Sequence, residues 1–149
     1  MKLFSVVFLL ASIAFAKNKV LYTVVVPGTD PKKPAQYDLF VMNDFKSPGT
    51  RLIERGRFSF VSSSDVIAYV REGNAEHKLF IITNFLNYNK IEIASDVETV
   101  KLQNNSLFYT QFEKVGDKVI RNLFVITDFK TLIKYKVQSD ISAFDVDLN

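Results

Sequence analysis

A seven-residue motif occurs three times in the sequence, and it constrains the fold more than any other feature. Leu-Phe, two aliphatic residues, a polar residue, Asn or Asp, and a final Phe make up residues 39–45, 79–85 and 123–129. The copies are separated by roughly 42 residues, a spacing that is typical of repeat architectures. We therefore expect three structurally equivalent units, with Phe40, Phe80 and Phe124 at equivalent buried positions.

The sequence around each motif has the pattern of β-strands. Val, Ile, Phe, Tyr and Thr cluster in short runs that Gly, Pro, Asn, Asp and Ser separate, and no amphipathic helical stripe follows residue 16. Before each motif we expect a strand that carries a tyrosine (the tyrosine strand), and after it a third and a fourth strand. The expected tyrosine strands cover residues 20–23, 66–70 and 106–110. The expected third strands cover residues 51–53, 90–93 and 132–137. The expected fourth strands cover residues 58–61, 97–102 and 141–148. The sequence predicts an all-β protein with three tandem four-stranded units.

A unit of this size cannot bury both faces of its own sheet, so the units must pack on one another. They resemble the blades of a β-propeller, of the type found in TolB proteins and in dipeptidyl-peptidase-like enzymes. Residues 62–71 and 79–82 carry the resemblance most clearly: a turn, an aliphatic-Tyr-Val strand, a polar hairpin and a Leu-Phe strand. The resemblance covers most of residues 20–149 and implies propeller-like blades.

Propellers usually contain four to eight blades, whereas this chain has three units. In propeller terms the chain starts with a second strand and ends with a first strand, so that its ends could pair. Closure could come from two chains that form a six-bladed ring, or the chain could be a truncated product of a longer gene. A β-trefoil, which closes three four-stranded units as a monomer, is the alternative, and a sandwich or another β arrangement is the third. A blade-like chain is expected to form a homodimer, and a trefoil to remain monomeric.

The amino-terminal residues 1–16 have the features of a cleavable secretory signal peptide. Lys2 precedes an apolar run over residues 3–15, and Ala14 and Ala16 occupy the −3 and −1 positions of a cleavage site. The run is too short to span a bilayer as a helix, so we expect no membrane insertion. The expected mature protein is one β-repeat domain over residues 17–149. It would be secreted to an extracellular, periplasmic or vacuolar-lumenal compartment, depending on the organism.

Charge and cysteine content exclude several functions. The chain has 19 Lys and Arg against 16 Asp and Glu, a net charge of +3, and the two signs are mixed along it. This distribution predicts no nucleic-acid partner. The absence of cysteine excludes thiol catalysis, thiolate metal sites and redox switching. Asn104, Asn105 and Ser106 form a sequon in a polar turn, which makes Asn104 the expected glycosylation site.

Few residues suggest catalysis. His77 is the only histidine and lies in a charged hairpin, where no neighbouring sequence suggests a triad or a metal cluster. Two acidic pairs, Glu72 with Glu76 and Asp96 with Glu98, lie in polar turns, and sequence proximity alone does not make them a glycosidase acid/base pair.

The carboxyl-terminal acidic residues suggest a calcium loop only in part. Asp145, Asp147 and Asn149 have the spacing that opens such a loop, but the required glycine and twelfth-position glutamate do not follow. Alternation along a half-exposed strand explains the same residues. We therefore predict no catalytic, cofactor-binding or metal-binding residues, and no cofactor.

These observations favour a secreted, non-enzymatic β-repeat module that binds a protein or a glycan through its loops. Prolines and glycines at positions 27–34 and 48–49 indicate longer loops in the first unit. One alternative is the propeller portion of a secreted dipeptidyl-peptidase-like hydrolase, although the 149 residues contain no Gly-x-Ser-x-Gly elbow. Another is a trefoil lectin or protease inhibitor.

Overall fold

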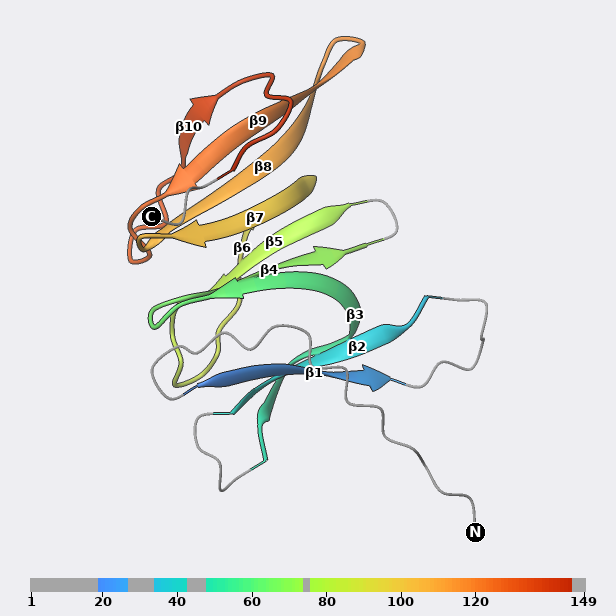
Figure 1. Cartoon of the computed structure of the whole chain (residues 1–149), viewed down its shortest axis with the longest axis vertical. Helices are drawn as coiled ribbons and strands as arrows, with labels where there is room; N and C mark the ends of the chain where they lie inside the picture. Colours follow the sequence, from blue (N-terminus) through green and yellow to red (C-terminus); the bar gives the residue numbers. More distant parts are fainter. Residues whose placement is uncertain (1–18, 27–33, 43–47, 74–75, 146–149) are drawn as a thin grey trace. The chain divides into compact units, whose positions relative to one another are not determined.

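The computed structural model describes residues 19–26, 34–42, 48–73 and 76–145, and these residues form antiparallel β-sheets without a helix (Figure 1). The all-β prediction is confirmed. The chain divides into two compact units, unit 1 (Met1–Arg57) and unit 2 (Phe58–Asn149), and each is described by itself. The strands are β1 (Val20–Val26), β2 (Gln36–Met42), β3 (Thr50–Ser62), β4 (Ile67–Glu72), β5 (His77–Ile82), β6 (Ile91–Ala94), β7 (Val97–Gln103), β8 (Ser106–Val115), β9 (Lys118–Ile126) and β10 (Tyr135–Gln138).

Unit 1 contains β1, β2 and the first part of β3. Its buried side chains are aliphatic and come from all three strands: Leu21, Leu39, Val41, Leu52 and Ile53. At Gly49, a Cβ atom would lie 2.7 Å from the Tyr22 hydroxyl oxygen and 2.8 Å from the carbonyl oxygen of Val41. Only glycine fits there, because a side chain would displace the tyrosine or the β2 backbone.

The strands expected at residues 51–53 and 58–61 are a single strand, β3, and that part of the prediction is wrong. The register between β2 and β3 shifts around Leu39, and Arg55 has a positive φ of 43°. The Arg55 backbone N–H donates to the Asp38 carboxylate at 2.7 Å, which holds this irregularity in place. The irregularity bends the strand without interrupting it, as a β-bulge does.

Unit 2 contains two antiparallel sheets. The first sheet has the order β3-β4-β5-β6, with the second part of β3, and the second sheet has the order β10-β9-β8-β7. β7 was expected as the fourth strand of its own repeat, but it pairs with β8, the tyrosine strand of the next repeat. Asn104 and Asn105 join the two strands with φ values of 46° and 59°, the geometry of a two-residue type I′ hairpin. The turn therefore assigns β7 to the second sheet.

The core of unit 2 lies between these two sheets. Alternate residues of β4 and β5 meet residues of β7, β8 and β9, and the cluster contains Val66, Ala68, Val70, Leu79, Ile81, Ala94, Val97, Val100, Leu107, Tyr109, Ile126 and Phe129. On the opposite face of the first sheet, Ile67, Tyr69 and Ile82 are also buried. β5 therefore has apolar residues on both faces and lies between β4 and β6, as expected for the Leu-Phe strand.

The three repeats share one aromatic pair. Tyrosine and phenylalanine stack across neighbouring strands in the pairs Tyr22–Phe40, Tyr69–Phe80 and Tyr109–Phe124, with ring centroids 5.3, 5.2 and 5.3 Å apart. The predicted equivalence of the phenylalanines is confirmed. Their predicted burial is wrong, because all three are half-buried. The alternation of the strand gives the fully buried positions to Leu39 and Leu79 instead.

The polar end of the motif forms a repeated turn. The Asn84 side-chain oxygen accepts the Leu86 N–H at 2.9 Å, and the Asp128 carboxylate accepts the Lys130 N–H at 2.8 Å. The backbone carbonyls of Asn84 and Asp128 each accept one further N–H, from Tyr88 and Leu132, at 3.0 Å. The turn explains why the motif has Asn or Asp here, because both side chains mimic a backbone turn.

Two expected strands of the third repeat differ from the structure. β10 begins at Tyr135 rather than at residue 132, because Leu132 has a φ of 55° and closes the preceding turn. The strand expected over residues 141–148 is wrong for residues 141–145, which are not in a strand, and residues 146–149 lie outside the described residues.

Candidate functional site

Four loops of unit 2 form a cavity at one end of its two sheets. These loops follow β3, β5, β7 and β9, which all run toward this end. The cavity (the loop-end cavity) has a volume of about 690 Å³ and is lined by Ser64, Asp65, Thr83, Phe85, Asn105, Thr127, Asp128, Phe129 and Lys130. Both sheets therefore contribute to one hollow, and the repeated Asn/Asp-Phe turn supplies part of its wall.

The lining combines hydrogen-bonding groups with aromatic rings. The Asp128 carboxylate accepts the Lys130 N–H and the Thr131 hydroxyl, and these bonds lower the pKa of Asp128 below its usual value. Asp128 is therefore an anion at neutral pH, and it holds the turn in place. The Asp65 carboxylate accepts only from the neighbouring Ser64 hydroxyl among the bonds described, at 3.0 Å, and is exposed. Hydroxyl, carboxylate and ammonium groups beside an aromatic ring are the kinds of group that orient polar ligands in protein cavities.

The expected glycosylation site borders this cavity. Asn104 is exposed in the β7–β8 turn, and Asn105 beside it lines the cavity. The positive φ values give both asparagines a structural reason to be present, since asparagine tolerates this conformation. Glycosylation of Asn104 stays a prediction.

A second cavity lies at the opposite end of unit 2 and contains the only histidine. It measures about 480 Å³ and is lined by His77, Asp96, Val97, Glu98, Phe112 and Val119. The structure thus brings His77 to the same hollow as one of the acidic pairs considered in the sequence. The Glu98 carboxylate is paired with the Arg121 guanidinium at 2.7 Å, and that guanidinium lies 5.4 Å from the Phe112 ring centre.

The hairpin that joins β8 and β9 adds a feature that the motif analysis missed. Phe112 is 36% exposed and Val119 is 65% exposed, both at this second cavity. The expected tyrosine strand at residues 106–110 and the motif at residues 123–129 do not include them, so the prediction missed both residues.

The other acidic candidates have surface roles. The Glu76 carboxylate lies 3.6 Å from the Lys78 ammonium group, which also contacts Glu92 at 3.2 Å. The hydrogen bond to Glu92 raises the pKa of Lys78. Glu72 is the last residue of β4 and is not a lining residue of either cavity.

Asp145 forms an ion pair with Lys101. Its expected calcium-loop companions, Asp147 and Asn149, lie outside the described residues, as do the proposed signal peptide and the loops at residues 27–33 and 43–47. Across the described part of the chain, no cluster of three or more His, Cys, Asp or Glu side chains is placed to hold a metal ion. Over the same residues, no helix is long and apolar enough to cross a membrane.

Comparison with known proteins yields a structural likeness alone. No protein-family model matches the chain, and no curated protein matches it in sequence. The fold is similar to part of the acylaminoacyl peptidase of Pyrococcus horikoshii, with a TM-score of 0.62 and 12% sequence identity. The match covers 87% of this chain and 24% of the peptidase chain, so this chain spans about a quarter of that enzyme. At this identity the likeness concerns the fold alone, and it supports a propeller-like resemblance.

Proposed function

We propose that the protein is an exported, non-enzymatic binding module built of propeller-like blades, and that it binds a protein or a glycan at the loop-end cavity of unit 2. One observation carries the proposal: four loops from two different sheets converge on one hollow that combines hydroxyl, carboxylate, amide, ammonium and aromatic groups. Loops on a rigid sheet scaffold are the usual position of binding residues.

The blade interpretation rests on the pairing of the strands. β7 leads the second sheet and β3 leads the first, and in each sheet the tyrosine strand comes next. The two sheets pack face to face through alternate residues, as neighbouring blades do. The likeness to the peptidase, at a TM-score of 0.62, agrees with blades rather than with a trefoil.

The chemistry of the cavity suits a ligand rich in hydroxyl or amide groups. Asp65 accepts hydrogen bonds, Lys130 donates them, and Thr83 does both. The ring of Phe85 is half-buried and offers an apolar surface beside these groups. A pyranose ring and an extended peptide both present polar edges and an apolar face. Glycans and proteins are therefore tested side by side in one experiment.

A glycan array and a panel of immobilised extracellular proteins test the proposal with protein purified from culture medium. The variant Asp65→Ala/Lys130→Ala should lose binding at least tenfold, because it removes an acceptor and a donor from the cavity. Lys118→Ala is the matched control, since Lys118 is exposed in the β8–β9 hairpin at the other end of the unit. Binding that is equal in wild type and in the double variant would contradict the assigned site.

Export has its own measurement. The proposal requires that the secreted form begins at Lys17, and the intact mass of material from the medium decides this. Digestion with a peptide N-glycosidase, compared with an Asn104→Gln variant, reports glycosylation at Asn104 in a glycosylating host. A secreted mass that includes Met1 would contradict cleavage.

A second function is the propeller portion of a secreted hydrolase, which the likeness to a peptidase favours. Under this proposal the catalytic groups belong to a further segment of the gene product. Sequencing the transcript beyond the codon for Asn149 tests it: an open frame with a Gly-x-Ser-x-Gly elbow supports the hydrolase, and a stop codon supports the binding module.

A further inference from the structure

Two segments of the chain, β1 and residues 141–145, differ in strand pairing from the equivalent segments of the other repeats. In each sheet of unit 2, the tyrosine strand pairs on one side with the strand that comes before it in the sequence, which we call the leading strand. The leading strand of β4 is β3, and the leading strand of β8 is β7. In unit 1 the tyrosine strand is β1, and it lies at the end of the strand order with β2 as its neighbour. Val24, on β1, is 38% exposed. The described residues of unit 1 thus have a tyrosine strand at a sheet edge.

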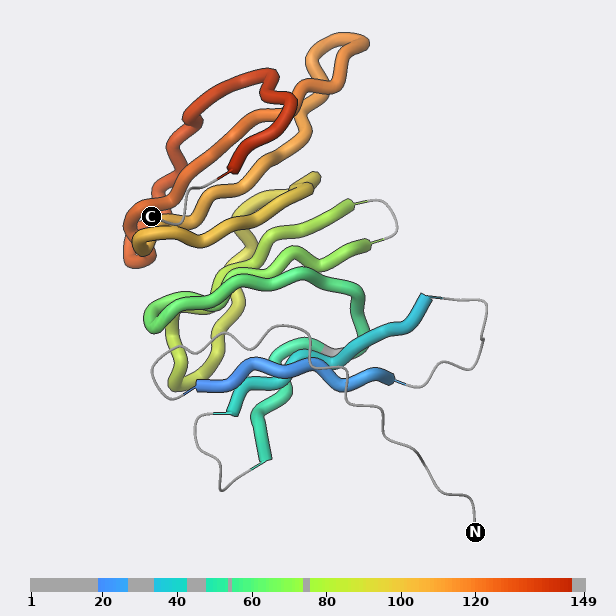
Figure 2. Tube along the Cα trace, in the orientation of Figure 1, coloured from blue at the N-terminus to red at the C-terminus, as the bar shows by residue number. Residues whose placement is uncertain are grey.

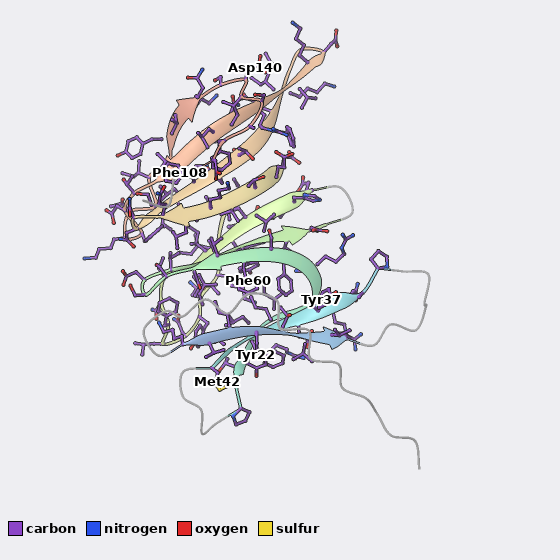
Figure 3. The ribbon with its side chains drawn as sticks, viewed as in Figure 1. Tyr22, Tyr37, Met42, Phe60, Phe108 and Asp140 are labelled. Atoms are coloured by element: carbon purple, nitrogen blue, oxygen red, sulfur yellow. The ribbon has the colours of Figure 1, made fainter. Side chains whose placement is uncertain are left out.

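Residues 141–145 have the features of a leading strand, but they are not paired in a sheet. Ser139, Asp140 and Ile141 repeat the sequence that opens β7, where Ser95 and Asp96 precede Val97. Asp96 and Asp140 both have a φ of 54°, so the chain turns in the same way before both segments (Asp140 is labelled in Figure 3).

The burial of side chains also repeats between the two segments. In β7 the most buried positions are Val97 and Val100, and the equivalent residues in the carboxyl-terminal segment are Ile141 and Phe144. Both are half-buried, whereas the residues between and after them are exposed. Residues 141–145 therefore repeat the burial pattern of the start of β7 without its strand pairing.

Contacts with the second sheet hold this segment in position. The Ile141 N–H donates to the Arg121 carbonyl at 3.0 Å, and the Arg121 guanidinium donates to the Ser142 carbonyl. The Lys101 ammonium lies 5.3 Å from the Phe144 ring centre and pairs with Asp145. Figure 2 shows the segment, in red, running back along β9 and β8. The segment is thus fixed beside the sheet, as a leading strand of a next blade would be.

We propose that two copies of the protein assemble by reciprocal strand exchange, in which residues 141–145 of each copy pair antiparallel with β1 of the other. The proposal uses the blade interpretation given above but not the ligand site. A second copy is the occupant because exchange within one chain would close a ring of only three blades, fewer than the four to eight that propellers typically contain. Each copy supplies one leading strand and one tyrosine strand, so two copies satisfy both needs in a symmetric interface.

The register of β7 with β8 gives the register of the exchanged pair. Val97 lies opposite Gln111, Thr99 opposite Thr110, and Val100 opposite Tyr109. Tyr22 is the equivalent of Tyr109, since each stacks on the phenylalanine of the next strand. Transferred to the exchanged pair, this register places Ile141 opposite Val24, Ala143 opposite Thr23 and Phe144 opposite Tyr22. Phe144 then extends the Tyr22–Phe40 stack, and aromatic cross-strand pairs stabilise antiparallel sheets.

Engineered cysteines test both the partner and the register. The chain has no cysteine of its own, so a disulfide in the variant Thr23→Cys/Ala143→Cys reports this contact alone. Under mild oxidation we expect a covalent dimer on a non-reducing gel, and also when the two single variants are mixed. Thr23→Cys/Lys118→Cys is the matched control and should remain without this band. An intramolecular disulfide, or equal dimer in the control, would overturn the proposal.

Sedimentation equilibrium supplies the second measurement, since cysteine variants report only proximity. Wild-type protein should sediment as a dimer at micromolar concentrations, and Phe144→Ser should weaken dimerisation at least tenfold. Val119→Ser is the control, because Val119 is exposed on the distant hairpin, and it should dimerise like wild type. Wild-type protein that sediments as a monomer at every concentration would contradict strand exchange. Ligand binding by Phe144→Ser separates this outcome from failure of the proposed function, because its loop-end cavity is unchanged.

Discussion

The two sheets of unit 2 contain two copies of the same repeat motif, but they differ in how much of each sheet is covered. In the first sheet the first four residues of β4 are all buried, and β5 has buried residues on both faces. In the second sheet β8 is buried only in its first half, and every residue of β10 is exposed. The repeat motif therefore specifies strand pairing and the aromatic stack, whereas burial depends on what covers each face.

Exposed apolar residues collect on the second sheet for the same reason. Phe112, Val115, Val119, Tyr135 and Val137 are all at least 36% exposed. The register places Phe112, Val119 and Tyr135 on one face of the second sheet, and residues 141–145 cover that face only in part. The contrast between the sheets can be tested residue by residue at equivalent motif positions.

The largest expected effect concerns the motif leucines. Leu79 is fully buried in the first sheet, while Leu123 at the same motif position is half-buried in the second. Leu79→Ala should lower the free energy of unfolding by about 3–4 kcal/mol, because it leaves a cavity in the core. Leu123→Ala should cost roughly 1–2 kcal/mol. Urea unfolding of both variants measures the difference, and equal losses would show that the two sheets are covered alike.

The stacked phenylalanines should respond equally in both sheets. Phe80 and Phe124 are both half-buried, and each stacks on the tyrosine of the neighbouring strand. Each Phe→Ala change should cost about 2 kcal/mol, less than the 3–5 kcal/mol of a fully buried phenylalanine. Thermal unfolding followed by circular dichroism provides the measurement. A loss confined to one variant would mean that the aromatic pair is not a shared element of the repeat.

Alkaline pH should destabilise the fold through the buried tyrosines. Burial raises the pKa of Tyr69 to about 12, although Arg71 opposes the shift, and burial also raises the pKa of Tyr109. The unfolded chain loses these protons near pH 10, so the stabilisation is complete below pH 10 and is lost as the pH rises toward the folded-state pKa values. The free energy of unfolding, measured from pH 8 to 12, should be constant below pH 10 and should decrease above it.

Tyr109→Phe isolates one of the two hydroxyls. The Tyr109 hydroxyl is buried without a hydrogen-bond partner among the described groups, so its removal should raise stability at pH 7 by roughly 1 kcal/mol. The same variant should fall less steeply above pH 10. A loss of stability at neutral pH would indicate that the hydroxyl has a partner in solution.

Local pattern was sufficient to predict the repeat and most of the strands, although residues 50–62 form one strand and residues 141–145 form none. The spacing of Leu39, Leu79 and Leu123 identified three equivalent strands, because strand pairing follows from local alternation. The grouping of β7 with β8 depended on the φ values of Asn104 and Asn105. The sequence predicted a polar turn at these residues, but it did not predict that the turn is a tight hairpin. The burial of the phenylalanines depended on tertiary packing, which has no local signature.

The site was harder to predict than the fold. The loop-end cavity joins residues 64–65 to residues 127–130, and no local spacing reports which loops meet. The Asn/Asp-Phe end of the motif was recognised as a repeated sequence, but its role as a turn in the cavity wall required the hydrogen bonds of Asn84 and Asp128. The sequence repeat therefore identified residues that line the cavity, but it did not show that a cavity is present.

The smallest expected effect distinguishes the two repeated turns by pH. In both turns the side-chain oxygen accepts the N–H two residues later, but only Asp128 is ionisable, and it also accepts the Thr131 hydroxyl. Backbone and hydroxyl donors lower the pKa of Asp128, so this stabilisation is present above the unfolded-state pKa and is lost as the pH falls through the lower folded-state value. Asp128→Asn copies the other turn and should remove this acid-side dependence while it keeps the acceptor for the Lys130 N–H. Amide hydrogen exchange at Lys130 between pH 2 and 6, corrected for intrinsic rates, measures it, with Leu86 as the internal reference. If protection at Leu86 and Lys130 declined in parallel as the pH fell, the ionised carboxylate would have no part in holding the second turn, and the aspartate would act like the asparagine of the first.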